Sequence, residues 1–380
     1  MSYKAFQDWY REGNIKHLLL HEHNGYLISP PFATERCKDY NSIMKYDNGT
    51  VSYIKTHLKP AVSKTNCALT TNNHTYFVPY GIYENDYGVI VKIHENNVMY
   101  SYVEAKGSGQ FYSGASNGIT AFSFPLGYSG TQYCLYIEND TPQLLPFSSV
   151  EKAHMGTVYC NDRYYSMPRG DKPGYNDLVS FDGKQFYYYY VPVNGNITRK
   201  YTDCIPVGNK LYSLPYGETA GLTEVVEFDT VTHEFLLHKL NVPDFAKKYN
   251  SMVLLGNKII GMPYGDEYCQ DSNWGVVFDT VTKESTPIDI GITHGGKYRY
   301  RCGIAYNNLA YFFPSGTPQC PLIVVNSNGV IQRMINFDYY MFGRPVIHKN
   351  KIHILAYHIH DETHHMFTFD EKLEFEIIDI

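Results

Sequence analysis

Several features are scarce or absent in this sequence, and each absence narrows the class of protein. No run of 18 or more apolar residues occurs, so we expect no membrane-spanning helix. The first residues, Met1 to Trp9, lack the apolar core of a signal peptide, which favours a cytoplasmic location. Basic residues are scattered and the formal net charge is −6, so nucleic-acid binding is not expected.

Recognised chemical motifs are also missing. The eight cysteines form no Cys-x-x-Cys pair, which is typical of reduced and mostly buried side chains. The glycine-rich dinucleotide turn, the phosphate loop, His-Glu-x-x-His and Gly-x-Ser-x-Gly are all absent. We therefore expect no cofactor and no metal, and the sequence favours a protein that is not an enzyme. Acidic residues could still act as a catalytic pair, as they do in glycosidases.

Tyrosine and phenylalanine dominate the aromatic residues. The chain has 37 Tyr and 20 Phe against only 2 Trp, and its apolar fraction of 43% is that of a globular protein. Tyrosine suits a half-buried pleated surface, so this composition favours strands. Abundant Tyr, Asn and Lys with scarce Trp is also typical of an AT-rich genome, including a viral one.

A short motif recurs along the chain and is the main clue to its fold. Its clearest copies end in Pro-Tyr-Gly, at 79–81, 215–217 and 263–265, and weaker copies lie between and beyond them. The marker positions are 30, 79, 125, 168, 215, 263, 314 and 356. Their intervals of 42 to 51 residues are typical of one four-stranded propeller blade each.

Each unit is predicted to contain four strands in a fixed order. The second strand ends at the marker proline, which cannot donate to a strand ladder, and the following glycine permits a sharp exit. The third strand ends in Asp or Asn, which begins a tight turn into the fourth. Because such a unit cannot bury both faces alone, we predict an all-β, single closed β-propeller of about eight four-stranded blades over residues 16–380. The alternative is seven blades.

The ends of the predicted propeller follow from the same layout. The first strand is expected at Leu18–Leu20 and the last at Phe375–Ile378, so the first and last blades should be neighbours. Residues 1–15 are predicted to form a short helix, because Phe6, Trp9 and Tyr10 share one helical face. This helix either docks on the propeller or binds a partner or a second copy of the chain.

Two turns carry a resemblance to a known family. Phe-Asp-Thr-x-Thr at 228–232 and again at 278–282 resembles the second half of a kelch repeat. The resemblance implies the propeller fold and carries over no activity. It also implies that the loops after the second strands gather on one face.

That loop face is the predicted binding site, for a protein partner in the first hypothesis. Tyrosine offers contact area with a polar tip, and carboxylates with an arginine provide specificity. A small-molecule binder or hydrolase is the second hypothesis, and a structural component of a viral or secreted assembly is the third. A His-x-His pair alone is too weak a signal for a metal site. The predicted site residues are Tyr80, Glu84, Arg169, Asp171, Tyr216, Glu218, Tyr264, Asp266, Glu267, His358 and His360.

Overall fold

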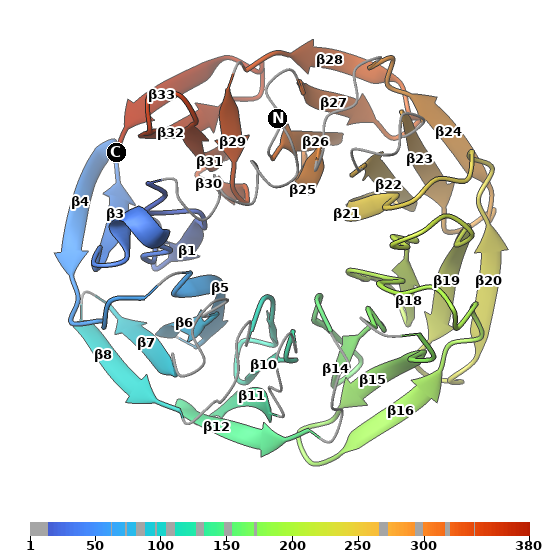
Figure 1. The fold of residues 1–380 in the computed structure, drawn as a ribbon, viewed down its shortest axis with the longest axis horizontal. Helices are drawn as coiled ribbons and strands as arrows, with labels where there is room; N and C mark the ends of the chain where they lie inside the picture. The colour runs from blue at the N-terminus through green and yellow to red at the C-terminus, as the bar shows by residue number, and fades with distance from the viewer. Residues whose placement is uncertain are drawn as a thin grey trace. The chain divides into compact units, whose positions relative to one another are not determined.

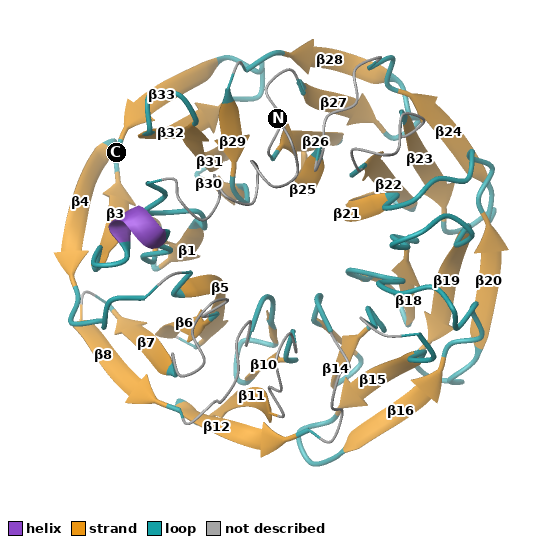
Figure 2. Ribbon diagram, viewed as in Figure 1, coloured by secondary structure: helices purple, strands orange, loops and turns teal. Residues whose placement is uncertain are grey.

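The computed structural model contains eight antiparallel β-sheets in its described part, and one short 3-10 helix, η1 (Glu35–Cys37), shown in purple in Figure 2. The eight sheets confirm eight blades over the alternative of seven. The predicted N-terminal helix lies almost entirely outside the described residues. No helix of the described part is long and apolar enough to cross a membrane. The structure describes residues 14–61, 63–72, 74–80, 88–95, 97–103, 111–126, 133–147, 154–170, 173–265, 273–292, 299–315, 320–337 and 339–380.

The chain forms two compact units. Unit 1 comprises residues 1–157 and 342–380, and unit 2 comprises residues 158–341. We number the blades one to eight in chain order. Unit 1 holds blades one, two and three and all of blade eight except residues 340 and 341 of its first strand, and unit 2 holds blades four to seven (Figure 1).

The strands of unit 1 pair in chain order within blades one, two and three, and in blade eight both β29 and β30 pair with β31. Blade one has β1 (His21–His23), β2 (Tyr26–Ser29), β3 (Ser42–Asp47) and β4 (Thr50–Lys55); blade two has β5 (Thr65–Thr71), β6 (His74–Pro79), β7 (Val89–His94) and β8 (Asn97–Tyr102); blade three has β9 (Ala115–Ser116), β10 (Ala121–Ser123), β11 (Tyr133–Glu138) and β12 (Thr141–Pro146); blade eight has β29 (Tyr340–Phe342), β30 (Val346–His348), β31 (Lys351–His358), β32 (Thr363–Phe369) and β33 (Phe375–Asp379).

The strands of unit 2 also pair in chain order. Blade four has β13 (Val158–Cys160), β14 (Arg163–Ser166), β15 (Asp177–Phe181) and β16 (Phe186–Tyr190); blade five has β17 (Ile205–Val207), β18 (Lys210–Ser213), β19 (Glu224–Asp229) and β20 (Phe235–Lys239); blade six has β21 (Tyr249–Leu255), β22 (Lys258–Pro263), β23 (Trp274–Asp279) and β24 (Ser285–Asp289); blade seven has β25 (Tyr300–Tyr306), β26 (Leu309–Pro314), β27 (Leu322–Asn326) and β28 (Ile331–Ile335).

The predicted layout of a blade is confirmed. Strands β6, β22 and β26 end on their marker prolines. The glycines that follow in blades five and six, Gly217 and Gly265, have φ angles of +63° and +73°. Such angles are costly for residues with a Cβ atom, so glycine allows the chain to leave the strand sharply.

The turns between third and fourth strands also form as predicted. In blade five, Asp229 Oδ1 accepts hydrogen bonds from Val231 N (2.9 Å) and Thr232 N (3.0 Å). In blade six, Asp279 Oδ1 accepts from the two equivalent amides. The aspartate side chain therefore fixes the turn by bonding its own backbone.

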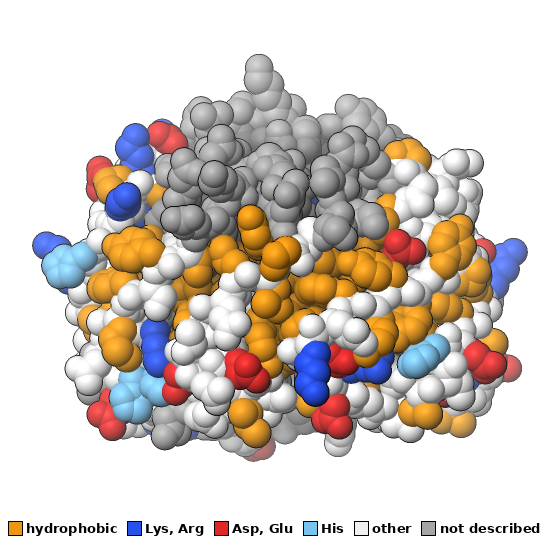
Figure 3. Space-filling model, turned by 90° about the horizontal axis from the view of Figure 1, so that it is seen from below, with side chains coloured by type: hydrophobic (Ala, Val, Ile, Leu, Met, Phe, Trp, Pro, Cys, Tyr) orange, Lys and Arg blue, Asp and Glu red, His pale blue; other side chains and the backbone are white. Residues whose placement is uncertain are grey.

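The fourth strands are the most exposed strands of the blades. Strand β20 shows the pattern, since Leu236 and Leu237 are both exposed, whereas the neighbouring strand β19 is mostly buried. Figure 3 shows hydrophobic side chains gathered in a band on the face that it displays. In contrast to this surface band, the hydrophobic core lies in the interior between successive blades. Tyr165 and Phe228, for example, join blades four and five.

Blades one and eight pack against each other within unit 1, as predicted. Leu20, Leu27 and Met44 share a core cluster with Leu355 and Met366. The expected first strand at Leu18–Leu20 is wrong, because β1 begins at His21. The Asn24-Gly25 turn fixes the hairpin, in which His23 pairs with Tyr26.

Candidate functional site

In unit 2, a chain of backbone hydrogen bonds connects the ends of the second strands from blade to blade. Lys248 N donates to Tyr216 O (2.8 Å), and Lys248 O accepts from Tyr264 N (2.7 Å). The pattern continues because Arg299 N donates to Tyr264 O and Arg299 O accepts from Ser315 N, both at 2.8 Å. Each of these ends is therefore held both by its own blade and by the next one.

In this pattern one residue uses both its backbone N and its backbone O. In four blades that residue is basic and its side chain is buried. Lys200 is an example, since its Nζ atom donates to Tyr175 O (2.9 Å) of the preceding blade. Burial lowers the pKa of Lys200 to about 8. Sequence reasoning missed this position, although the signal was a basic residue 15 positions before a marker proline. Lysine and arginine are rarely buried, so the spacing did not indicate a structural role. The four residues are Lys64, Lys200, Lys248 and Arg299.

A buried tyrosine follows three of these basic residues and braces its blade. Tyr249 OH donates to Trp274 O (3.2 Å), and Tyr300 OH donates to Pro321 O (3.0 Å). Tyr201 OH makes the equivalent bond in blade five. Each bond connects the start of the blade to the start of its third strand, so the second-strand ends rest on a rigid framework.

Four predicted site residues of unit 2 lie at these second-strand ends. Tyr216 and Tyr264 come from adjacent blades, and their ring centroids are 5.7 Å apart. Burial raises the pKa of Tyr216 well above its usual value; Tyr264 and Glu218 add to the increase, while Arg169 and Arg199 oppose it. The Tyr216 hydroxyl is therefore held in its neutral form.

Glu218 is the centre of an ionic network that spans two blade connections. Its carboxylate accepts from Arg199 Nη1 (3.1 Å) and from Lys247 Nζ (3.2 Å). Arg199 and Lys247 occupy equivalent positions and share a left-handed backbone, with φ of 50° and 51°. The side chains are 35% exposed for Arg199, 29% for Glu218 and 11% for Lys247, so this network reaches solvent.

The tyrosines at the predicted site do not form an open aromatic surface. Tyr80, Tyr216 and Tyr264 are only 5 to 6% exposed, and Arg169 is equally buried. Their rings pack within the protein instead. What this site offers to a ligand is therefore the Arg199–Glu218–Lys247 network, and sequence reasoning found only Glu218 of the three.

The remaining predicted residues belong to unit 1 or lie outside the described residues. Tyr80, His358 and His360 belong to unit 1, where Tyr80 contacts Tyr112 at 5.8 Å between ring centroids. His358 Nδ1 lies 2.9 Å from Asp361 Oδ2. Glu84, Asp171, Asp266 and Glu267 lie outside the described residues.

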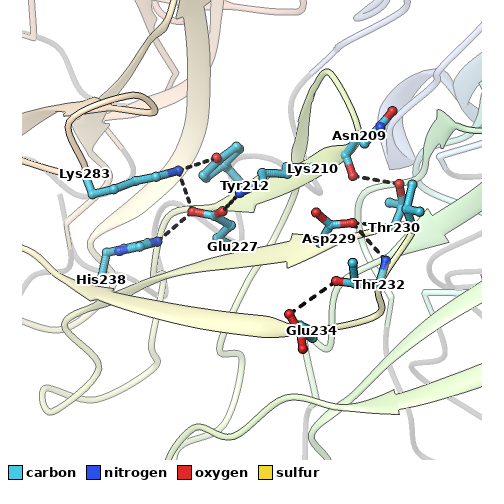
Figure 4. Close-up of polar contacts among 11 residues, drawn as sticks. Asn209, Lys210, Tyr212, Glu227, Asp229, Thr230, Thr232, Glu234, His238 and Lys283 are labelled. Atoms are coloured by element: carbon cyan, nitrogen blue, oxygen red, sulfur yellow. Dashed lines mark hydrogen bonds and ion pairs between the residues drawn. The ribbon is translucent and has the colours of Figure 1, made fainter.

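A second polar cluster connects blades five and six around Glu227 (Figure 4). Glu227 Oε1 accepts from Lys210, and Oε2 accepts from His238 Nε2 (2.7 Å) and from Lys283 Nζ (2.6 Å). Lys283 comes from blade six and also donates to Tyr212 OH (2.7 Å). These basic partners outweigh the cost of burial and lower the pKa of Glu227 to about 2. The cluster is an electrostatic contact between blades.

Neither cluster resembles a metal or redox centre. Across the described part of the chain, no group of three or more His, Cys, Asp or Glu side chains converges to hold a metal ion. The seven cysteines that the structure describes are all free thiols, and six of them are buried. Burial raises the pKa of Cys67 to about 12, so its thiolate is disfavoured.

Comparisons with known proteins bear on the fold alone. No protein-family model matches the chain, and no curated protein matches it. Among solved structures, apo AztD from Citrobacter koseri superposes with a TM-score of 0.56 at 9% identity, covering 96% of this chain and 94% of that one. The computationally designed Ika8 protein gives a TM-score of 0.54 at 10% identity, covering 83% and 96%. Together with the eight antiparallel sheets, seven of four strands and one of five, these likenesses show an eight-bladed β-propeller fold.

Proposed function

We propose that this β-propeller is a non-enzymatic binding module that recognises a protein partner through the second-strand ends of unit 2. The observation that carries the proposal is the Arg199–Glu218–Lys247 network, which is partly exposed and held by two successive blades. Arginine is enriched at protein interfaces, where its planar group forms directional bonds.

The rigid framework beneath the network supports the same proposal. Lys247 N donates to Gly217 O (2.6 Å), and Lys247 O accepts from Gly265 N (3.1 Å). Arg199 is held in the same way between Gly170 and Gly217. Side chains on a fixed backbone lose less conformational freedom when a partner binds, so more of the contact energy appears as affinity.

A pull-down from the native cell tests this function. The charge-reversed variant Arg199→Glu/Lys247→Glu is compared with the wild type and with a control, Lys184→Glu/Arg333→Glu. The control changes the charge by the same amount at two exposed positions of unit 2. We expect a protein captured by the wild type and the control and lost from the network variant.

Two results would count against the proposal. A partner retained by both variants would place recognition elsewhere on the molecule. Capture of no protein by the wild type would remove support for a protein-binding module. Circular dichroism of each variant checks that the strands are intact before capture is compared.

A further inference from the structure

The contact between blades eight and one depends on a histidine that must be neutral. His364, in β32, accepts a hydrogen bond from the backbone N of Lys16 through Nε2 (2.9 Å). A backbone N–H can only donate, so Nε2 must carry no proton in this arrangement. His364 is buried, and its ring lies 5.0 Å from that of Tyr357, whose hydroxyl accepts from Asn14 N (3.1 Å).

A second buried histidine, His17, holds the same segment, residues 14–20, to blade one. His17 is 3% exposed, and its Nδ1 lies 3.1 Å from both Ser29 Oγ and Pro30 O. Its Nε2 lies 2.9 Å from Tyr40 OH. With the proton on Nδ1, directed at the carbonyl of Pro30, Nε2 accepts from the tyrosine hydroxyl. A second proton would convert that acceptor into a donor.

The charges around these two histidines oppose a proton. For His364, the neighbouring charges are those of Lys16, His17 and His365, and each disfavours the protonated ring. For His17, Lys16 acts in the same direction. Burial is the largest cause in both cases, and it lowers the pKa of His17 to about 4 and that of His364 to about 3.

Ion pairs at the same contact favour the closed state. Arg36 Nη1 lies 2.5 Å from Glu362 Oε1, and Lys349 Nζ lies 3.9 Å from Asp47 Oδ1. These side chains are largely exposed, so each pair contributes little. His348 Nδ1 lies 3.7 Å from Glu22 Oε2, and protonation would strengthen that contact. Glu22 is half exposed, so this contact also contributes little.

We propose that mild acid releases residues 14–20 from both blades that hold them. Protonation of His364 breaks its bond from Lys16 N on the side of blade eight. Protonation of His17 disturbs its bond with Tyr40 OH on the side of blade one. Exposed histidines bind protons near pH 6.5, whereas these two resist protonation while the contact is closed. The closed state is therefore favoured fully above pH 6.5 and progressively less as the pH falls. At pH 5.5 each histidine raises the opening equilibrium constant about tenfold, and the two together about a hundredfold.

Hydrogen–deuterium exchange of the full chain measures this opening. Exchange is compared at pH 7.5 and pH 5.5 in peptides that cover residues 14–20, after correction for the intrinsic pH dependence of amide exchange. We expect a rise of about a hundredfold in wild type, reversed on return to pH 7.5. His364→Gln provides an amide oxygen that accepts from Lys16 N at either pH, so its rise should be only about tenfold.

A neighbouring histidine provides the matched control. His365 bonds Asp379 (2.9 Å) and not residues 14–20, so His365→Gln should behave like wild type. His17→Gln/His364→Gln should show almost no acid effect. Equal acceleration in wild type and double variant would overturn the proposal. If the variants do not fold, wild type alone decides: no acceleration at residues 14–20, or the same acceleration in β18 and β19, would also overturn it.

Discussion

The two units of this propeller use different chemistry where their blades meet. Only His233, His238 and His294 of the 16 histidines belong to unit 2, and the others belong to unit 1. In unit 1, buried neutral histidines lie between blades, as His23 and His364 show. In unit 2, ion pairs connect the blades, as Glu227 and Lys283 show. In the same fold, polar groups between blades are therefore paired either through neutral histidines or through ion pairs.

The difference matters because the two kinds of contact respond to pH in separate ranges. A buried neutral histidine loses its contribution to stability as the pH falls below 6.5. A carboxylate with a lowered pKa keeps its contribution down to its unfolded pKa near 4.5 and loses it below that value. Between pH 6.5 and 4.5 we expect the buried histidine contacts of unit 1 to weaken and the Glu227 contact of unit 2 to keep its strength.

The largest single effect is expected from Glu227 in unit 2. Glu227→Gln leaves Lys210 and Lys283 without their carboxylate at a side chain that is only 2% exposed. Removing one partner of a buried ion pair costs about 3 to 5 kcal/mol in the free energy of unfolding. Urea denaturation at pH 7.5 measures the loss. Glu234→Gln, an exposed change in the same blade, should stay within about 0.5 kcal/mol of wild type.

The difference in free energy of unfolding between wild type and Glu227→Gln should depend on pH. The folded pKa of Glu227 is lowered to about 2, so its contribution is complete above pH 4.5 and disappears as the pH falls toward 2. The gap between wild type and Glu227→Gln should therefore be constant from pH 7.5 to 5 and shrink below 4.5. A gap that closes already between pH 6.5 and 5 would contradict this assignment.

A smaller effect is expected from Gly343 in unit 1. Gly343 N donates to Leu355 O (2.8 Å), and an added Cβ atom would collide with the backbone oxygen of Leu18. Because a backbone atom cannot move aside cheaply, Gly343→Ala should lower the free energy of unfolding by about 2 kcal/mol. Thermal denaturation checks it. Gly195→Ala in unit 2 is the control, since the nearest atom to its new Cβ is 3.8 Å away.

The smallest effect is expected from a turn in unit 2. Asp229→Ala removes the hydrogen bonds from Val231 N and Thr232 N, which lie in an exposed turn and can bond to water instead. The expected loss is about 1 kcal/mol in urea denaturation. A loss as large as that of Glu227→Gln would mean that the turn, and not the buried carboxylate, dominates the connection of blade five.

The sequence by itself determined the repeat and the layout of each blade, and the eight sheets of the structure decided between eight blades and seven. Proline at position 263, glycine at 265 and aspartate at 279 act locally, through a missing donor, a permitted φ angle and a side-chain bond to the next amides. Local rules of this kind are visible at fixed spacing in a sequence. They fail where a distant contact intervenes, as at Leu19, which bridges to Arg344 in the last blade.

Only the tertiary structure decided which polar side chains meet. Arg199, Glu218 and Lys247 lie far enough apart in the sequence that no local pattern relates them, and the blade connections bring them together. The structure also showed that the marker tyrosines are buried and that Lys200 is a structural residue. Burial and pairing depend on contacts between blades, and those depend on the packing of segments about 50 residues apart. The strands and turns of a repeat can therefore be predicted from the sequence, whereas the partners of its charged side chains are known only from the tertiary structure.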